Sequence, residues 1–198
     1  MKKQILTLMV TVAVLVSTSA FSMLPEEKSI ENKSTRIPHS FQYTKDDYIL
    51  RSPRTDKEWS AYHEMRIAEI HNQYCPECVY DYEDPEETKE CNFRFVLLSP
   101  ESTVLGTIRV DLLEKEKEAS LRLVTIRKEA QRQGLGRRML ELAEWFIKDK
   151  GRILIRVPVE EESRRFYEKL GYTYKDWPEG PKNSGNIPLA KEITSFQP

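Results

Sequence analysis

The sequence predicts one mixed α/β domain built around a single central sheet. Stretches with strand-like alternation and stretches with a helical apolar stripe follow one another along most of the chain. The chain has 198 residues, of which 39% are hydrophobic. Without a short N-terminal segment about 175 residues remain, enough for one sizeable core and too few for two ordinary domains. The formal net charge of -1 argues against non-specific nucleic-acid binding, which requires a strongly basic domain.

Residues 1–22 have the features of a secretory signal peptide. Two lysines precede an apolar run from Ile5 to Val16, and small residues follow it. The run is short for a membrane-spanning helix, but extended to Met23 the segment approaches spanning length, so an uncleaved anchor is a second interpretation. A third is that translation starts at Met23. The first two predict an exported or membrane-anchored protein, and the third a cytoplasmic one.

Residues 23–42 are polar and predict a flexible linker, so the folded domain is expected over 43–198. Thr55 and Glu58 match a capping box, which predicts a helix after them. Gly106 indicates a bulge in its strand. The strands expected in this half of the domain are Tyr48–Leu50, Phe93–Leu97, Val104–Leu113 and Ser120–Arg127.

In the second half, a helix with an apolar stripe follows Gly136 and ends at Gly151. Ile153–Val159 is apolar enough for a buried strand. The remaining elements are a short helix at Ser163–Leu170 and a closing antiparallel pair at Tyr172–Tyr174 and Ile187–Ile193.

The turn between the strand ending at Arg127 and the next helix carries the clearest chemical signal. It reads Gln131-Arg132-Gln133-Gly134-Leu135-Gly136. A glycine-rich turn at a helix start presents unpaired N–H groups and the positive end of the helix dipole, which suit a pyrophosphate. The alternative is that the glycines serve close packing alone. The turn is neither a Walker loop nor a dinucleotide fingerprint.

This segment and two others resemble the GNAT family of N-acetyltransferases. Gln131, Gly134 and Gly136 match the family's shared motif, Gln/Arg-x-x-Gly-x-Gly/Ala after a strand. Phe166-Tyr167 followed by Gly171-Tyr172 matches an aromatic signature about thirty residues later. Val104–Arg109 resembles the family's third strand. The resemblance extends over roughly Tyr48–Ile193.

The resemblance implies acetyl-CoA, or another acyl-CoA, as co-substrate, bound at a V-shaped opening between Ser120–Arg127 and Ile153–Val159. It implies that pantetheine pairs with the backbone of Val124, Thr125 and Ile126. The residues expected around the pyrophosphate are Gln131, Arg132, Gln133, Gly134, Leu135, Gly136 and Arg137.

The resemblance also suggests catalytic groups. Tyr167 corresponds to the family tyrosine that protonates the leaving thiolate, although it is also a good helix-face aromatic. Glu160 and Asp111 are candidate bases by position, and a solvated strand-end carboxylate is the alternative for each. The family usually has Asn where this chain has Glu160, and Ala where it has Ser163, so cofactor contacts in that corner are open.

The segment from Glu77 to Glu90 holds seven acidic residues and one lysine. In the family's layout this region flanks the acceptor cleft, where it would attract a positively charged amine such as a polyamine, an aminoglycoside or a lysine side chain. A merely solvated acidic loop is the alternative.

His71, Cys75, Cys78 and Cys91 form a spaced cluster of soft ligands. Zinc, a disulfide with one remaining thiol, and ordinary thiols are three open interpretations. The functional alternative to an enzyme is therefore an inactive acyl-CoA-binding or zinc-stapled interaction module.

Overall fold

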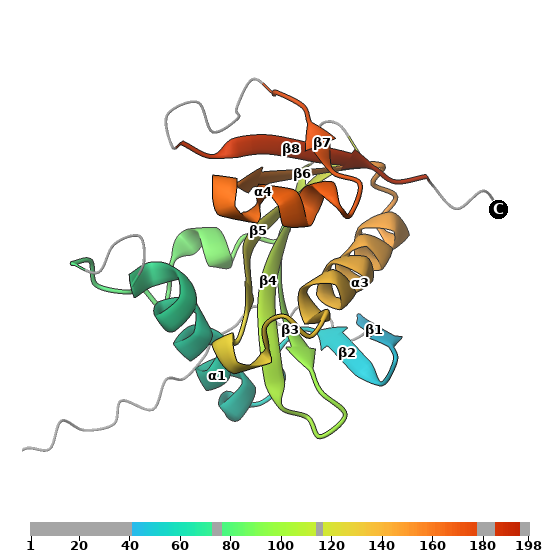
Figure 1. Cartoon of the computed structure of the whole chain (residues 1–198). Helices are drawn as coiled ribbons and strands as arrows, with labels where there is room; N and C mark the ends of the chain where they lie inside the picture. Colours follow the sequence, from blue (N-terminus) through green and yellow to red (C-terminus); the bar gives the residue numbers. More distant parts are fainter. Residues whose placement is uncertain (1–40, 73–76, 114–116, 178–184, 195–198) are drawn as a thin grey trace, which may run out of the picture. The chain divides into compact units, whose positions relative to one another are not determined.

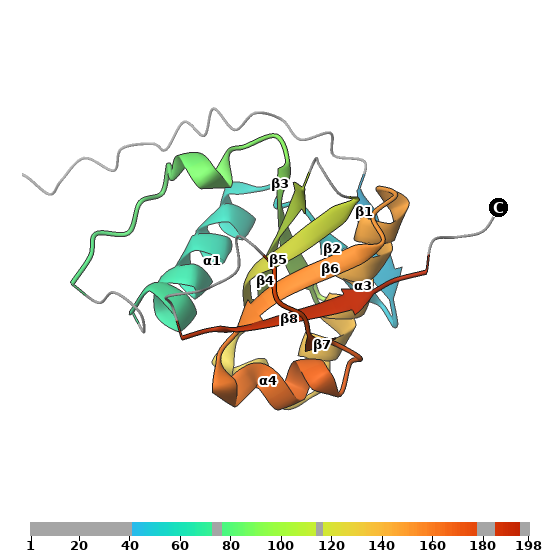
Figure 2. The same ribbon diagram turned by 90° about the horizontal axis from the view of Figure 1, so that it is seen from above.

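The computed structural model describes residues 41–72, 77–113, 117–177 and 185–194. These residues form one mixed sheet of eight strands with helices on both faces (Figures 1 and 2). The strands are β1 Gln42–Lys45, β2 Tyr48–Arg51, β3 Asn92–Leu98, β4 Val104–Leu113, β5 Glu118–Ile126, β6 Leu154–Val159, β7 Thr173–Tyr174 and β8 Ile187–Glu192. The helices are α1 Asp56–Arg66, α3 Leu135–Asp149 and α4 Glu161–Glu168, with short turns η1 Ile67–His71, η2 Pro85–Glu87 and η3 Lys128–Ala130. The predicted fold class is confirmed.

The strand order is β1-β2-β3-β4-β5-β6-β8-β7. All neighbours are antiparallel except β5 and β6, which are parallel. Strand β1 is the element the sequence analysis missed. It begins at Gln42, the last residue of the expected linker, and the preceding Phe41 already packs edge-on against Phe146, with ring centroids 5.6 Å apart.

One face of the sheet carries the main apolar core. Helix α3 presents its stripe there because apolar residues recur every three or four positions. Met139, Leu142 and Phe146 are fully buried, and Phe146 contacts Phe95 of β3 at a centroid distance of 4.8 Å. Tyr167 of α4 belongs to the same core cluster.

Helix α1 covers the opposite face with a smaller apolar cluster. Its Tyr62 and Met65 pack with Val96 and Leu98 of β3. Figure 2 shows the result, with α1 on one side of the central strands and α3 and α4 on the other. The two faces of the sheet therefore differ in the elements and side chains that cover them.

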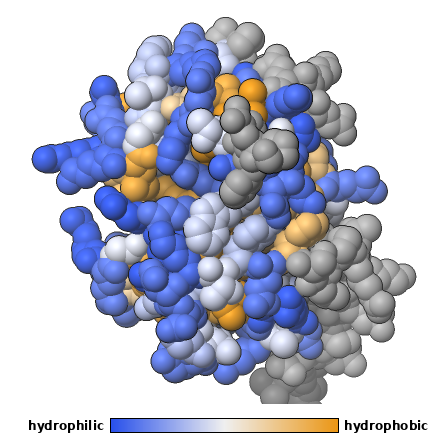
Figure 3. All heavy atoms as spheres, turned by 90° about the vertical axis from the view of Figure 1, so that its right-hand side faces the viewer, coloured by the Kyte–Doolittle hydropathy of each residue, from blue (hydrophilic) through white to orange (hydrophobic). Residues whose placement is uncertain are grey.

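The face on the α3 side is largely hydrophilic, with small and separate apolar patches (Figure 3). Among the described residues, the structure contains no helix with the length and apolar character needed to cross a membrane. The expected leader, residues 1–22, and nearly all of the expected linker lie outside the described residues.

Candidate active site

The two parallel strands at the centre of the sheet separate after a short paired stretch. Their register runs from Glu118 opposite Leu154 to Ser120 opposite Arg156. Beyond these pairs, β5 continues to Ile126 and β6 to Val159 without pairing with each other. Main-chain groups of β5 therefore face a gap, where an extended ligand can pair with them as an added strand.

A β-bulge shapes the strand at this gap. Arg122 pairs with Arg109 and Thr125 pairs with Thr107, so two residues of β5 oppose one residue of β4. Leu123 in the bulge has φ of 53°, a left-handed conformation that costs a non-glycine residue about 1–2 kcal/mol. Strain of this kind at the mouth of a gap is typical of a functional position. The sequence carries no signal for it, because leucine is not a residue that favours positive φ.

The bulge expected at Gly106 has a different basis. The register of β4 against β3 does shift next to Gly106, between Leu97 and Leu98. The need for glycine is steric, because a Cβ atom at residue 106 would lie 2.6 Å from Cδ1 of Ile126. Gly106 therefore lets the end of β5 lie close against β4.

The glycine turn follows directly from this strand and leads into α3. Gly134 caps the helix with φ of 78°, and a Cβ atom there would meet nothing within 4 Å. The first helical hydrogen bond is donated by the Arg138 N–H to the Gly134 carbonyl, at 3.1 Å. The N–H groups of the preceding turn, from Leu135 to Arg137, therefore lack helical acceptors. An open turn with unpaired donors at a helix N-terminus fits a pyrophosphate.

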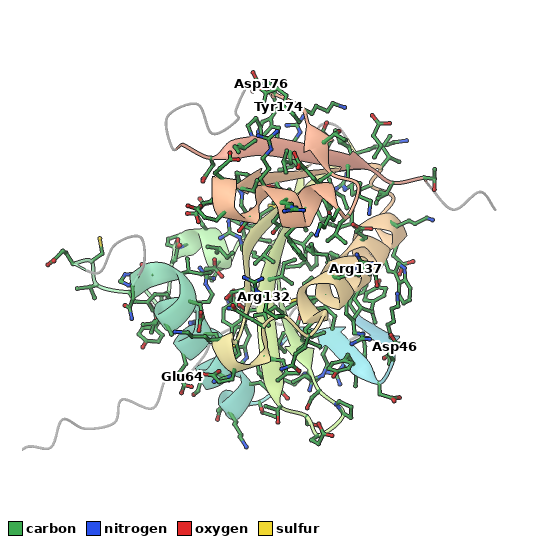
Figure 4. All side chains as sticks on the ribbon, in the orientation of Figure 1. Asp46, Glu64, Arg132, Arg137, Tyr174 and Asp176 are labelled. Atoms are coloured by element: carbon green, nitrogen blue, oxygen red, sulfur yellow. The ribbon has the colours of Figure 1, made fainter. Side chains whose placement is uncertain are left out.

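Side-chain hydrogen bonds hold the turn in place, and two exposed arginines belong to it. The Gln131 side-chain amide donates to the Ile126 carbonyl at 2.9 Å, and that of Gln133 donates to the Glu129 carbonyl at 3.3 Å. Arg132 and Arg137 are exposed (Figure 4), and no carboxylate among the described residues pairs with either. These two guanidinium groups remain available to a phosphate.

The second glycine of the turn brings α4 close to α3. A Cβ atom at Gly136 would lie 3.2 Å from Cζ of Phe166, so with any larger residue the Phe166 ring would have to shift by a few tenths of an ångström. Phe166 immediately precedes Tyr167, and the two rings are in edge contact with centroids 5.1 Å apart. The two sequence motifs, the glycine turn and the Phe166-Tyr167 pair, thus meet where α3 contacts α4.

Tyr167 is suited to donate a proton. Its side chain is buried against the ring of Tyr172, and burial raises the pKa of its phenol. The hydroxyl has no hydrogen-bond partner among the described residues. A phenol that is protonated at neutral pH and not engaged elsewhere can act as a general acid.

The two candidate bases lie in different surroundings. Glu160 caps α4 just after β6 and is half-buried, and its carbonyl accepts from the N–H groups of Ser163 and Arg164 at 3.0 and 3.1 Å. Asp111 is buried in β4 and receives two hydrogen bonds from Arg109, with Nε–Oδ1 and Nη2–Oδ2 distances of 2.8 and 3.0 Å. Burial raises the pKa of Asp111, while Arg109 lowers it. Arg109 binds both carboxylate oxygens of Asp111, whereas the Glu160 carboxylate accepts no N-cap hydrogen bond.

Only some of the carboxylates in the acidic segment, Glu77 to Glu90, are exposed at the surface. Glu87 points inward and bridges two arginines, and Glu86 pairs with Lys89 on the surface. Glu77, Asp81 and Glu83 are exposed.

The described members of the expected cysteine cluster have different surroundings. Cys78 is disulfide-bonded, and Cys91 is a free thiol that contacts the Asn92 side-chain oxygen at 3.4 Å. The His71 ring packs edge-on against Tyr80, with centroids 5.6 Å apart. Within residues 41–72, 77–113, 117–177 and 185–194, no three metal-binding side chains gather. Cys75 lies outside this part of the chain.

Comparison with known proteins gives a consistent picture. The family model described as the acetyltransferase (GNAT) family matches residues 59–172. No curated protein matches the chain.

Several solved structures share the fold. A GNAT-family acetyltransferase from Staphylococcus aureus is 12% identical with a TM-score of 0.60, over 74% of this chain and 99% of that one. The PaiA N-acetyltransferase of Thermoplasma acidophilum, solved with coenzyme A, is 16% identical with a TM-score of 0.56, over 74% and 99%. An aminoglycoside 6'-N-acetyltransferase, also solved with coenzyme A, is 14% identical with a TM-score of 0.59, over 75% and 99%.

Proposed function

The chain belongs to the GNAT acetyltransferase family, and from that premise we propose that it transfers the acetyl group of acetyl-CoA to a primary amine. The observation that carries the proposal is the meeting of three features at one place. These are the separating strands β5 and β6, the open glycine turn before α3, and the buried Tyr167 of α4. Together they provide a place for an extended thioester, for its pyrophosphate and for the proton that the thiolate needs.

Acetyl-CoA is the co-substrate, and the chain offers two kinds of main-chain contact to it. The free edge of β5 from Val124 to Ile126 pairs with the pantetheine arm, which extends the sheet by one strand. Residues Gln131–Arg137 supply N–H groups and the exposed arginines to the pyrophosphate.

The reaction is a direct attack within a ternary complex. The amine nitrogen forms a bond to the carbonyl carbon, and the carbon–sulfur bond breaks. A main-chain N–H at the β5 bulge stabilises the developing negative charge on the oxygen. Tyr167 gives its proton to the leaving sulfur, and Glu160 takes the proton of the amine through water. Asp111 is the less suitable base, because Arg109 already holds both of its oxygens.

The amine arrives as a cation, since primary amines are protonated at neutral pH. The exposed carboxylates of Glu77, Asp81 and Glu83 raise the local concentration of such a cation. The compartment depends on the leader: residues 1–22 export or anchor the protein if they are translated, and a start at Met23 leaves it cytoplasmic. Sequencing the N-terminus of the native protein distinguishes these cases.

Gly134 permits a test that separates charge from size. We expect calorimetry on the full chain to show coenzyme A binding. Asn and Asp both tolerate positive φ, and there is free space at this position. Gly134→Asn should keep the affinity within a few fold, whereas Gly134→Asp places a carboxylate against the pyrophosphate and should weaken binding by about 50-fold or more.

Absence of any affinity of the wild-type chain for coenzyme A or acetyl-CoA would contradict the proposal. Equal affinities of the two variants would show that the phosphates bind elsewhere.

A further inference from the structure

Three arginines form a row across the face of the sheet that α1 covers. The register places Arg94 of β3 opposite Arg109 of β4, and Arg109 opposite Arg122 of β5. The next row contains Asp111 and Ser120, and Ser120 belongs to the last pair before β5 and β6 separate. The arginine row therefore begins where the gap between the two strands opens.

The nearby carboxylates are already used by other cations. The Glu87 carboxylate binds Arg66 at 2.7 Å through one oxygen and Arg109 at 2.6 Å through the other. Asp111 is held by both the Nε and Nη2 atoms of Arg109. The central arginine of the row is thus fully compensated, whereas Arg122 has only a long contact with Asp111, and Arg94 forms no ion pair with a described residue.

Arg94 is the unusual member of the row. Its side chain is 6% exposed, and its guanidinium lies over the ring of Trp59, 4.7 Å from the centroid. It donates no hydrogen bond to any described residue, and its Nε is enclosed without an acceptor. Burial lowers the pKa of Arg94, and the more distant charge of Glu87 only partly offsets this effect. A buried cation is normally paired, because burial without a partner costs several kcal/mol.

Arg122 lies at the other end of the row, beside the bulge. Its side chain is 46% exposed, and its closest carboxylate oxygen, Oδ2 of Asp111, is 3.9 Å from its Nε. Neighbouring strands are about 4.8 Å apart, so the backbones of Arg94 and Arg122 are separated by roughly 10 Å. Arginine side chains are long enough to converge on one small anion across that distance.

We propose that the acceptor carries a carboxylate as well as its amine, and that Arg94 and Arg122 bind this carboxylate on the α1 face. This inference rests on the proposed acetyl transfer and specifies the acceptor class. The arginine row lies two to three residues along β5 from Val124–Thr125, or about 7–10 Å. The acceptor is therefore an amino acid whose reacting amine is several bonds from its carboxylate. The acidic segment attracts its amine end, and Arg94 and Arg122 bind its carboxylate end.

Matched amines with and without a carboxylate test this directly. Lysine is compared with cadaverine, and 4-aminobutyrate with butylamine, by thiol release from acetyl-CoA and by calorimetry on the chain saturated with coenzyme A. We expect each carboxylate-bearing amine to have a lower KM or Kd than its partner. In Arg94→Gln this preference should fall by about 10- to 100-fold, as for loss of a charge-assisted hydrogen bond. Affinity for coenzyme A should stay unchanged.

Three further variants separate recognition from folding. Arg94→Lys keeps the charge and should retain part of the preference. Arg122→Gln changes an exposed side chain, so it tests the same site in a chain that folds normally. Lys57→Gln removes an exposed cation on the outer side of α1 and should change nothing.

The outcomes are distinguishable. No binding of coenzyme A overturns the proposed function itself. Coenzyme A binding without a preference for carboxylate-bearing amines overturns the inference alone. An equal effect of Arg122→Gln and Lys57→Gln on the preference also overturns it.

Discussion

The two faces of the central sheet are built from different chemistry. Under α3 and α4 the packing is apolar and aromatic, and Phe146 is surrounded by Phe41, Phe93 and Phe95. Under α1 the sheet carries buried arginines and carboxylates, and the apolar cluster is small. Apolar burial stabilises without direction, whereas buried charge is costly unless paired. The first face therefore supplies stability, and the second holds buried charged groups in fixed positions.

The largest expected effect tests the apolar face. Phe146→Ala removes a fully buried ring from the centre of the aromatic cluster and should lower the free energy of unfolding by about 3–5 kcal/mol. Trp145→Ala, on the neighbouring and 42% exposed position of α3, should have a much smaller effect. Urea denaturation followed by circular dichroism measures both. Similar losses would mean that this face is not the source of stability.

The next effect tests the charged face. Glu87→Gln removes the carboxylate that joins Arg66 and Arg109 and should lower the free energy of unfolding by about 2–4 kcal/mol. Glu86→Gln is the matched control, because this neighbouring side chain is exposed and pairs with Lys89 on the surface. A comparable loss in the two variants would contradict a structural role for the buried network.

The ion pairs of Glu87 with Arg66 and Arg109 also predict that the free energy of unfolding depends on pH. Burial raises the pKa of Glu87, but Arg66 and Arg109 lower it more, so the pKa lies below the ordinary 4.5. The Glu87 contribution is present above about pH 4.5 and is lost as the pH falls through the lower folded-state pKa. Glu87→Gln should lack this loss in acid denaturation.

The proposed transfer reaction uses Tyr167, which packs on the apolar face, and Tyr167→Phe tests this role. Removing the proposed acid should lower kcat by about 100-fold, or about 2.7 kcal/mol, with little change in coenzyme A affinity. Tyr172→Phe is the control, since its hydroxyl contacts Glu144 instead. Because burial raises the pKa of Tyr167, the wild-type kcat should not fall through loss of this proton between pH 7 and its ordinary pKa of 10.0. An unchanged kcat in Tyr167→Phe would assign the proton to another group.

Local signals predicted most of the elements. The apolar stripe of α3 and the bounds of β4 were readable because each depends on periodicity within one segment. Strand β1 also had a signal that was overlooked. Asp46 and Asp47 both have positive φ, 49° and 66°, which makes a tight hairpin turn between β1 and β2.

Long-range contacts were not readable. The capping box at Thr55 forms as expected, with the Glu58 N–H donating to Oγ1 at 3.2 Å. Its other half differs, because the Glu58 carboxylate binds the Arg54 N–H and the guanidinium of Arg51 on β2. The alignment of Arg94 with Arg122 likewise depends on the register of three strands, which no local pattern encodes.

The smallest expected effect is a pH dependence of stability that arises from the α1 face and not from the apolar face. His63 of α1 contacts Tyr80, with Nδ1 and Oη 3.0 Å apart, and burial, aided by Arg66 and Arg94, lowers its pKa to about 4. The unfolded chain takes up this proton near pH 6.5, so stability should decline as the pH falls from 6.5 towards 4. His63→Gln should flatten that decline by about 1 kcal/mol, a modest value because the ring is only partly buried. Phe146→Ala should keep the full decline, since it leaves the charged face intact. A decline of equal size in His63→Gln would show that another group on this face titrates in the same range.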